Sequence, residues 1–349
     1  MKIMTKYSFL YDYAEGAHPE ILKALTETNT IQQLGYGEDE YCLEAAKLIK
    51  NIFELPYAEI HFVSGGTQAN MTVISSILKP YESVIAAQTG HIAVHEAGAI
   101  EFTGHKINTI KTPDGKLTPE LIKPVLIEHC DEHMVVPKLV YISNSTELGT
   151  IYTKKDLKEL SYFCKENNLM LFMDGARLGS SLTSKDQDLT PKNIKDFVDV
   201  FYIGGTKNGA LTGEAIVLIN DNLKEKFRYS MKQKGALLAK SRLFGVQFAV
   251  LFKNNLFFDL ATYSNKLAYK FAEEITNLGY KFIAEPQTNI IFPVIPDKTV
   301  LKLEKKFMFY PWKKYDKNNT TIRLVTSWAT KEEKIDEFLE ILSKDSHNS

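Results

Sequence analysis

The sequence predicts an α/β protein, with a large domain built on a mostly parallel sheet covered by helices and a smaller C-terminal α+β domain. Short apolar runs alternate with helical stretches between about residues 58 and 220. Continuous apolar strands separated by helices are typical of parallel sheets that are buried on both faces. After Gly235 the pattern changes to long helical segments and then two strand-like runs, and 349 residues suffice for two domains.

The chain is predicted to begin with an irregular arm, residues 1–20. Pro19 suits the first position of a helix, where its missing N–H costs least, and residues 20–25 have helical spacing. A loop of glycine and acidic residues follows at 35–41, before a helix through Ala45 and Ile52. Loops of this composition often carry function.

Six apolar runs are predicted strands of the large sheet, and the segments between them are predicted helices. The strands are 59–63, 83–87, 106–110, 139–143, 169–173 and 198–203, and the helices include 67–78 and 154–167. In sheets of this kind, ligands bind beyond the carboxyl ends of the strands. Functional side chains are therefore expected directly after each run.

The C-terminal third is predicted to form the smaller domain. Residues 236–278 are helical in pattern, strands are expected at 289–294 and 321–326, and a closing helix begins at Lys331. We expect a large domain at 21–250 and a small domain at 251–349, a division of ordinary domain sizes.

Composition excludes several classes of partner. The chain is 44% hydrophobic and 24% charged, and 42 basic residues balance 43 acidic ones. No global field therefore favours nucleic acid or an anionic membrane, and no segment approaches the ~20 apolar residues that cross a bilayer. The balanced charge leaves a small-molecule ligand as the expectation. The three cysteines, Cys42, Cys130 and Cys164, are odd in number and lack Cys-x-x-Cys spacing, so we expect a reducing, cytoplasmic setting.

Lys207 is the strongest candidate for covalent chemistry. It lies in Gly204-Gly205-Thr206-Lys207-Asn208-Gly209, directly after an apolar run. Glycines allow a ligand to approach the backbone closely, and a partly desolvated lysine loses its proton more easily. An amine that forms Schiff bases with carbonyl compounds needs both properties.

Two further motifs follow predicted strands. Gly66 and Thr67 begin a helix after 59–63, where unpaired N–H groups suit a phosphate, although a plain turn remains the alternative. Asp174 directly follows the strand at 169–173, where a protonated ring nitrogen would serve as its partner, and Arg177 presents a planar fork for a carboxylate. The alternative for that pair is a structural Asp–Arg ion pair at a helix start.

Histidines follow another strand. His91 suits stacking on an aromatic ring or proton transfer. A zinc site is the rival, because His91 and His95, like His129 and His133, have helix-compatible spacing, but no third ligand is evident and no metal is expected. His95 is predicted to be a packing or supporting residue.

Arg323 lies in the apolar strand 321–326, where an unpaired charge is costly. It should meet either a protein carboxylate or the carboxylate of a substrate, and the sequence leaves both open.

Taken together, His91, Gly66-Thr67, Asp174-Gly175-Ala176-Arg177 and Thr206-Lys207 resemble the pyridoxal-phosphate enzymes of the aspartate aminotransferase fold (fold type I). More narrowly, they resemble the threonine aldolase branch of the β-eliminating lyase family. The resemblance spans nearly the whole chain, because three more segments are similar to that family: Tyr36-Gly37-Glu38-Asp39, Thr288-Asn289-Ile290-Ile291-Phe292 and Ile322-Arg323-Leu324-Val325-Thr326.

The resemblance implies roles for these residues. Lys207, His91 and Asp174 would be catalytic: Lys207 as the Schiff-base lysine of pyridoxal 5'-phosphate, Asp174 on the ring nitrogen and His91 stacked on the ring. Gly66, Thr67 and Thr206 would complete the cofactor site, and Arg177 with Arg323 would bind the substrate carboxylate. The family is oligomeric with active sites shared between subunits, so we expect a homodimer or homotetramer in which Lys232 or Lys234 reaches the neighbour's phosphate.

The implied reaction is retro-aldol cleavage of L-threonine, L-allo-threonine or a related β-hydroxy-α-amino acid to glycine and an aldehyde. β-Elimination or transamination of another amino acid is the alternative, and a non-catalytic protein of the same fold is a third. Two departures from the family bear on this choice. Many threonine aldolases have a Ser-Asp-Thr segment near the N-terminus, whereas this chain has Leu10-Tyr11-Asp12-Tyr13, and their second histidine has no counterpart in Ser143-Asn144-Ser145-Thr146-Glu147. The base for the β-hydroxyl is therefore open.

Overall fold

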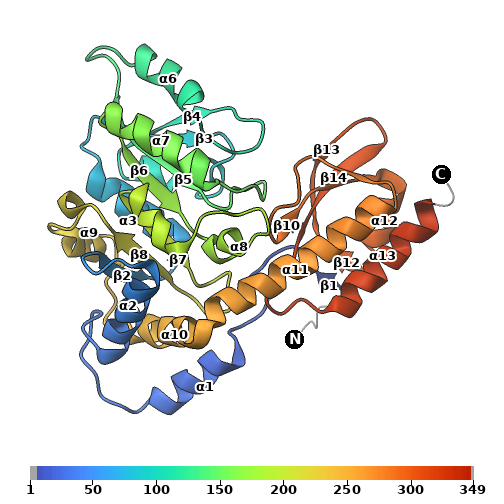
Figure 1. Cartoon of the computed structure of the whole chain (residues 1–349), viewed down its shortest axis with the longest axis horizontal. Coiled ribbons are helices and arrows are strands. Elements are labelled where there is room, and N and C mark those ends of the chain that lie inside the picture. The colour runs from blue at the N-terminus through green and yellow to red at the C-terminus, as the bar shows by residue number, and fades with distance from the viewer. Residues whose placement is uncertain (1–5, 347–349) are drawn as a thin grey trace.

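In the computed structural model, which describes residues 6–346 and side chains through residue 344, the central sheet has seven strands in the order β2-β8-β7-β6-β5-β3-β4 (Figure 1). The strands are β2 Glu59–Val63, β3 Glu82–Ala87, β4 Lys106–Ile110, β5 Val136–Ser143, β6 Met170–Asp174, β7 Val200–Gly204 and β8 Glu214–Leu218. All six predicted strands are present, and β3 to β7 pair in parallel, which confirms the mostly parallel sheet.

β8 was not among the strands predicted from the sequence. It pairs antiparallel with both β7 and β2. The connection 205–213 explains the direction, because it is shorter than the dozen or more residues that a parallel crossover needs. The loop that carries Lys207 is consequently a tight return between two adjacent strands.

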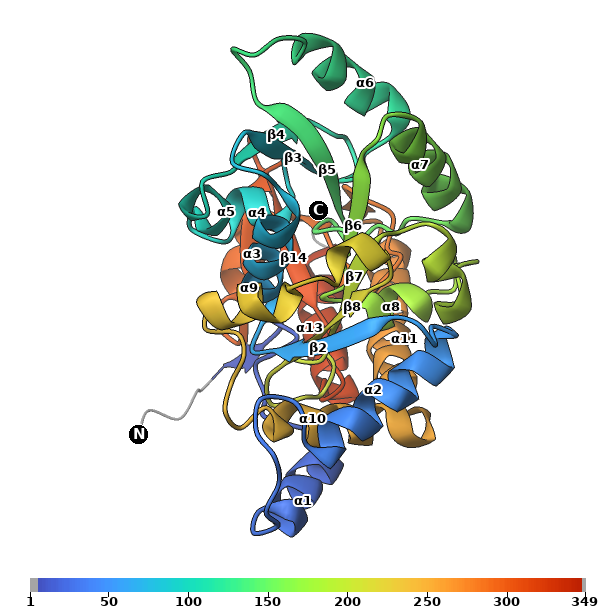
Figure 2. The same ribbon diagram turned by 90° about the vertical axis from the view of Figure 1, so that its left-hand side faces the viewer.

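Helices cover both faces of the sheet (Figure 2). Alternate residues of β5 show this: Val140 and Ile142 belong to the core under α2, α7 and α10, whereas Leu139 and Tyr141 belong to the core under α3 and α9. Burial on both faces explains why the strands lack polar alternation. The helices of this domain are α1 Pro19–Thr28, α2 Glu40–Phe53, α3 Gly66–Ile77, α4 His91–Val94, α5 Ala99–Phe102, α6 Pro119–Glu128, α7 Lys154–Glu166, α8 Leu178–Leu182, α9 Phe227–Gln233 and α10 Arg242–Phe252.

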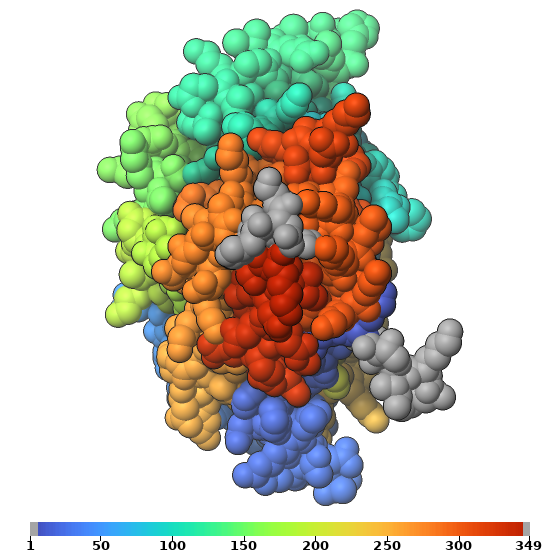
Figure 3. All heavy atoms as spheres, turned by 90° about the vertical axis from the view of Figure 1, so that its right-hand side faces the viewer, coloured from blue at the N-terminus to red at the C-terminus, as the bar shows by residue number. Residues whose placement is uncertain are grey.

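The smaller C-terminal part contains an antiparallel sheet around β14, with helices packed against it. In the space-filling view of Figure 3, the orange and red atoms of this part form much of the face toward the viewer. The predicted strand 289–294 is divided into two short strands that meet different ends of β14, so that β10 pairs with its C-terminal end and β11 with its N-terminal half. The elements are β9 Lys281–Phe282, β10 Ile290–Ile291, β11 Pro293–Pro296, β12 Phe307–Met308, β13 Tyr310–Lys314, β14 Asn319–Val325, α11 Leu256–Asn277, α12 Asp297–Leu303 and α13 Glu332–Ser346.

The helical stretch predicted at 236–278 is two helices, α10 and α11, separated by a break. Asn254 and Asn255 both have positive φ there, a conformation that asparagine tolerates better than most residues. α11 then packs against α8 of the large domain and α13 of the small one. Within residues 6–346, no helix is long and apolar enough to cross a membrane.

The N-terminal arm is not irregular throughout, which corrects the expectation for residues 1–20. β1 Tyr7–Ser8 pairs in parallel with β12, and the next residue, Phe9, is fully buried in the core of the small domain. Residues 1–5 lie outside the described part of the chain. The arm therefore joins the small domain before α1 enters the large one, and the boundaries at residues 20 and 250 stay predictions.

Candidate active site

A cavity of about 250 Å³ lies at the carboxyl ends of β5, β6 and β7. Among the predicted site residues, it is lined by Gly66, Thr67, His91, Asp174, Arg177, Thr206 and Lys207. A second cavity, of about 380 Å³, contains Arg323 and shares five lining residues with the first: Tyr13, His91, Glu147, Arg177 and Lys207. We call them the lysine cavity and the arginine cavity, and the shared residues show that they adjoin.

Lys207 follows β7 and faces both cavities. Burial, reinforced by the positive charge of Arg177, lowers the pKa of its amine, whereas nearby carboxylates oppose this shift. Gly204 allows the end of β7 to lie close to the backbone of Ala176, because a Cβ at this position would lie 2.2 Å from the Ala176 carbonyl oxygen. The geometry thus provides a lysine that loses its proton more readily than one on the surface.

Asp174 is the last residue of β6, and its side chain is buried at the base of the lysine cavity. Burial alone would raise its pKa, but the charge of His91 and hydrogen bonds from Tyr141 and Tyr202 lower it overall. Tyr141 donates to Oδ2 at 2.5 Å, and the Ala176 N–H donates to Oδ1 at 2.9 Å. The carboxylate therefore stays ionised, and it is suited to hold a cationic ring nitrogen.

His91 is oriented by a buried network that sequence reasoning missed. Its Nδ1 lies 2.7 Å from Oε1 of Glu96, whose side chain is fully buried. Asn70 Nδ2 donates to the same Glu96 oxygen at 2.7 Å and to Asp174 Oδ2 at 3.2 Å. The network therefore links the imidazole to Asp174. Asn70 lies on α3 and Glu96 lies five positions after His91, and nothing local in the sequence indicated that they meet.

The helix α3 points its N-terminus into the lysine cavity. Its N-cap, Gly65, makes no side-chain hydrogen bond to the helix, so the first N–H groups remain available to an anion. A Cβ on Gly66 would lie 3.0 Å from the Tyr202 hydroxyl, which explains glycine at this position. Ser64, Thr67 and Thr206 also line the cavity. This arrangement suits a phosphate group.

Glu214, at the start of β8, is a further buried residue of the lysine cavity that the sequence reasoning did not select. Its Oε2 accepts a hydrogen bond from the Gly205 N–H at 3.0 Å. Burial raises the pKa of this carboxyl to about 8, although Thr206 and Lys207 oppose the shift. Its burial follows from the antiparallel pairing of β8, which the sequence reasoning also missed.

Arg177 does not form the structural pair with Asp174 that was the alternative expectation. Its Nε and Nη2 donate to Asp12 Oδ2 and Oδ1 at 2.6 and 3.0 Å. Asn289 Nδ2 also donates to Asp12, at 3.0 Å. Burial would raise the pKa of Asp12, but Arg177 and Lys207 lower it overall, so the pair is charged. Asp12 comes from the N-terminal arm, 165 positions away, which is why no local pattern showed it.

Arg323 has no carboxylate within ion-pair distance among the described residues, in contrast to Arg177. Its Nη1 donates to the Leu10 carbonyl at 3.2 Å. Burial and the neighbouring Arg177 lower its pKa to about 10, which is still well above neutral. Arg323 is therefore a charged group in the arginine cavity that can accept an anionic ligand.

The remaining histidines do not assemble a metal site. His95 follows α4 and is an exposed residue that lines the arginine cavity. α6 ends at Glu128, so His129 and His133 do not share the helix that their spacing suggested. Within the described chain, no three His, Cys, Asp or Glu residues lie together as metal ligands would.

Fold and site together define a class: an enzyme of the aspartate aminotransferase fold, with a lysine, a buried carboxylate and an anion-binding helix end around one cavity. A structure of an aromatic aminotransferase from Pyrococcus horikoshii shares this fold, with a TM-score of 0.73 at 16% identity over 99% of this chain and 97% of that one.

The family model for β-eliminating lyases matches residues 12–298, and the chain belongs to that family. A low specificity L-threonine aldolase from Pseudomonas aeruginosa is 33% identical over 85% of this chain and 84% of its own length. A structure of a threonine aldolase from Leishmania major is 46% identical, with a TM-score of 0.96 over 97% of this chain and 99% of that one. The resemblance inferred from the motifs is thereby confirmed.

Proposed function

We propose that this protein is a pyridoxal 5'-phosphate-dependent lyase that cleaves L-threonine, L-allo-threonine or a related β-hydroxy-α-amino acid to glycine and an aldehyde. The observation that carries the proposal is that Lys207 and Asp174 line one cavity directly beside the cavity of Arg323, which has no carboxylate partner within the described part of the chain. Relatives that match most of the chain bear the name threonine aldolase, which favours aldol cleavage over β-elimination or transamination.

The lysine cavity fits the cofactor group by group. The ionised, buried Asp174 would pair with the ring nitrogen, Lys207 would hold the aldehyde carbon, and His91, oriented by Glu96, would stack on the ring. Gly66 and Thr67 at the uncapped end of α3, with Thr206, would receive the phosphate. When bound, pyridoxal phosphate supplies a conjugated ring that accepts the electron pair released at the substrate's α-carbon.

The arginine cavity would receive the substrate's carboxylate. Arg323 is the better placed of the two predicted arginines, because the fork of Arg177 is already occupied by Asp12. Arg177 keeps further N–H groups and lines both cavities, so it would support the carboxylate from the other side. Holding the carboxylate fixes the orientation of the bonds at the α-carbon relative to the cofactor.

We further propose a cytoplasmic homodimer or homotetramer. The three cysteines are free thiols, as expected in a reducing compartment. Lys232 lies over the Tyr36 ring, with its Nζ 4.7 Å from the ring centroid, and the Lys234 carbonyl accepts from Gln68 beside the phosphate turn. Sedimentation velocity on the purified protein would distinguish dimer from tetramer.

The cofactor assignment is tested by visible absorbance of the purified protein reconstituted with pyridoxal phosphate. We expect a band from a protein-bound Schiff base that is absent in Lys207→Ala and retained in Lys195→Ala, a lysine outside both cavities. A band that persists in Lys207→Ala would show that another amine holds the cofactor.

The reaction is tested by measuring glycine released from threonine, allo-threonine and phenylserine. Glycine and the matching aldehyde are expected from at least one of them. Pyruvate and ammonia from serine, without glycine from any β-hydroxy amino acid, would replace the proposal with β-elimination.

A further inference from the structure

Retro-aldol cleavage requires a group that takes the proton of the substrate's β-hydroxyl. The inference about which residue does so rests on the function proposed above. The bond that breaks joins the α-carbon, which would lie beside Lys207, to the β-carbon. A base for that hydroxyl must therefore reach the junction between the lysine cavity and the arginine cavity. Five residues line both cavities, and they are the candidates: Tyr13, His91, Glu147, Arg177 and Lys207.

Four of the five are committed or chemically unsuited. Lys207 would bind the cofactor and, once displaced by the substrate, exchange the proton at the α-carbon, and Arg177 is a permanent cation paired with the arm carboxylate. Burial raises the pKa of the Tyr13 hydroxyl, which therefore keeps its proton near neutral pH. The imidazole of His91 is fixed through Nδ1 by a buried carboxylate, in an orientation suited to stacking. Glu147 remains.

Glu147 is held by one of its two carboxylate oxygens. Oε1 accepts hydrogen bonds from Ser143 Oγ and from the His91 N–H, each at 2.8 Å. Within the described residues, Oε2 accepts no hydrogen bond, while the residue is half-buried and borders both cavities. Burial raises the pKa of this carboxyl, and the charge of Asp174 adds to the shift. Its carboxylate is consequently a stronger base than that of a surface glutamate.

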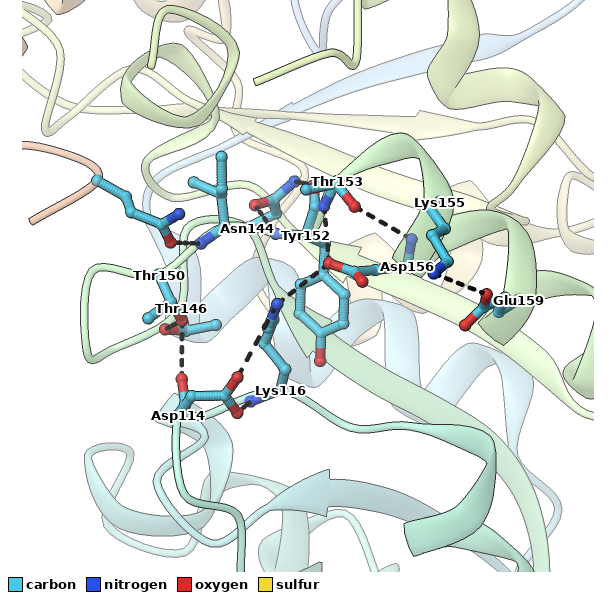
Figure 4. A network of polar contacts seen from close by, with 12 residues as sticks. Asp114, Lys116, Asn144, Thr146, Thr150, Tyr152, Thr153, Lys155, Asp156 and Glu159 are labelled. Carbon is cyan, nitrogen blue, oxygen red and sulfur yellow. Dashed lines mark hydrogen bonds and ion pairs between the residues drawn. The ribbon is translucent and has the colours of Figure 1, made fainter. Parts of the chain in front are cut away.

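The loop that carries Glu147 is held by hydrogen bonds on both sides of that residue. Figure 4 shows the polar network around it: Asn144 Oδ1 accepts from the Tyr152 N–H at 3.1 Å, and the Thr146 and Thr150 hydroxyls lie 2.6 Å apart. Thr150 also donates to the Asp114 carbonyl at 2.7 Å. Both sides of Glu147 are therefore anchored, which keeps its carboxylate at the cavity junction.

We propose that the Glu147 carboxylate is the general base that accepts the proton of the substrate's β-hydroxyl. The O–H electron pair becomes the second carbon–oxygen bond of the aldehyde as the Cα–Cβ bond breaks. When bound, the cofactor would accept the Cα–Cβ electron pair, and addition of a proton at Cα would complete glycine. One proton leaves the hydroxyl and one is added at carbon, so the reaction is balanced in protons.

The test compares two reactions of the holoenzyme. Threonine cleavage needs the base, whereas exchange of glycine's α-proton with deuterated solvent, followed by NMR, needs the cofactor and Lys207 but no hydroxyl base. Glu147→Gln keeps the size and an acceptor for Ser143 and His91. We expect it to lower kcat for threonine by about 100-fold or more. Glycine exchange and the visible spectrum should stay near those of the wild type.

Matched variants make each outcome decisive. Glu147→Asp keeps a carboxylate and should retain part of the cleavage, and it serves as the second variant if Glu147→Gln folds poorly. A rate of cleavage near that of the wild type in Glu147→Gln would overturn the proposal. Loss of cleavage in His95→Asn, with cleavage retained in Glu147→Gln, would overturn it as well. An equal fall of cleavage and exchange in both Glu147 variants would overturn it too, because Glu147 would then be structural. Failure of the proposed function is distinct, since the wild type itself would release no glycine.

Discussion

At the scale of single residues, the site depends on charges held out of water. Asp12 and Arg177 face each other with side chains that are 1% and 11% exposed. Removing one partner of such a pair is costly, because the other charge stays buried without compensation. The pair also connects the N-terminal arm to the end of β6, so it links stability to the shape of both cavities.

Asp12→Asn should lower the free energy of unfolding at pH 7 by about 3–5 kcal/mol. Because the pKa of Asp12 is lowered in the folded protein, its contribution is present above its ordinary pKa of 3.8 and is lost as pH falls through the folded value. Urea denaturation at several pH values measures both effects. Asp221→Asn, whose ion pair with Lys224 is exposed at the carboxylate, should cost under ~1 kcal/mol. Equal losses in the two variants would contradict the prediction.

Glu214 should make the cofactor-free protein less stable as pH rises. The folded protein holds the proton of this carboxyl more tightly, with a pKa of about 8 against an ordinary value of 4.5. Its stabilising contribution is therefore complete below about pH 4.5 and is lost as pH rises towards 8. Thermal unfolding of wild type and Glu214→Gln across this range should show a steeper decline in the wild type. Parallel curves would contradict it.

At the scale of elements, the site exists because parallel strands end together. Ser143 on β5 and Asp174 on β6 are register partners, and β7 ends beside β6. The residues that follow these strands therefore lie close together at one edge of the sheet. The loops need glycine where they pass closest, as Gly204 does against the backbone of Ala176.

Gly204→Ala should destabilise the protein by about 3 kcal/mol or more, because the added Cβ meets backbone atoms that cannot rotate away. Cofactor binding should weaken with it, since the loop displaced is the one that carries Lys207. Gly16→Ala is the matched control, with no atom within 4 Å of the added Cβ. Urea denaturation and titration with pyridoxal phosphate measure the two effects. A stable Gly204→Ala protein would show that the loop can move apart.

At the scale of the whole molecule, the arm holds the small domain to the site. Phe9 is fully buried against Phe271, Phe307 and Phe338, and its carbonyl accepts from the Val325 N–H at 3.0 Å. Only two residues, Leu10 and Tyr11, separate this anchor from Asp12, the ion-pair partner of Arg177. A substitution that weakens the packing of Phe9 in the small domain should therefore also weaken binding of the substrate carboxylate.

Phe9→Ala should lower the free energy of unfolding by about 3–5 kcal/mol, the usual cost of truncating a buried phenylalanine. It should also raise KM for the amino-acid substrate, because the arm carries Asp12 and the Leu10 carbonyl that contacts Arg323. Tyr57→Ala, at a side chain that is 87% exposed, should change neither. Loss of stability without any rise in KM would show that the arm and the site are independent.

Local sequence predicted the sheet, the strand-end positions of Lys207 and Asp174, and the helix start at Gly66, because hydrophobic periodicity and glycine placement depend on neighbours along the chain. β8 was missed because a short antiparallel return depends on the length of a connection rather than on composition.

Tertiary folding alone paired Arg177 with Asp12 across 165 positions and left Arg323 free of a carboxylate in the described chain. It likewise brought Glu147 to the junction of the two cavities. Long-range charge pairing and burial depend on which surfaces meet, and a single chain's local pattern does not contain that information. Lys207 could thus be predicted as a reactive amine from its neighbours, whereas the groups that face it were decided by how the arm and the two domains pack.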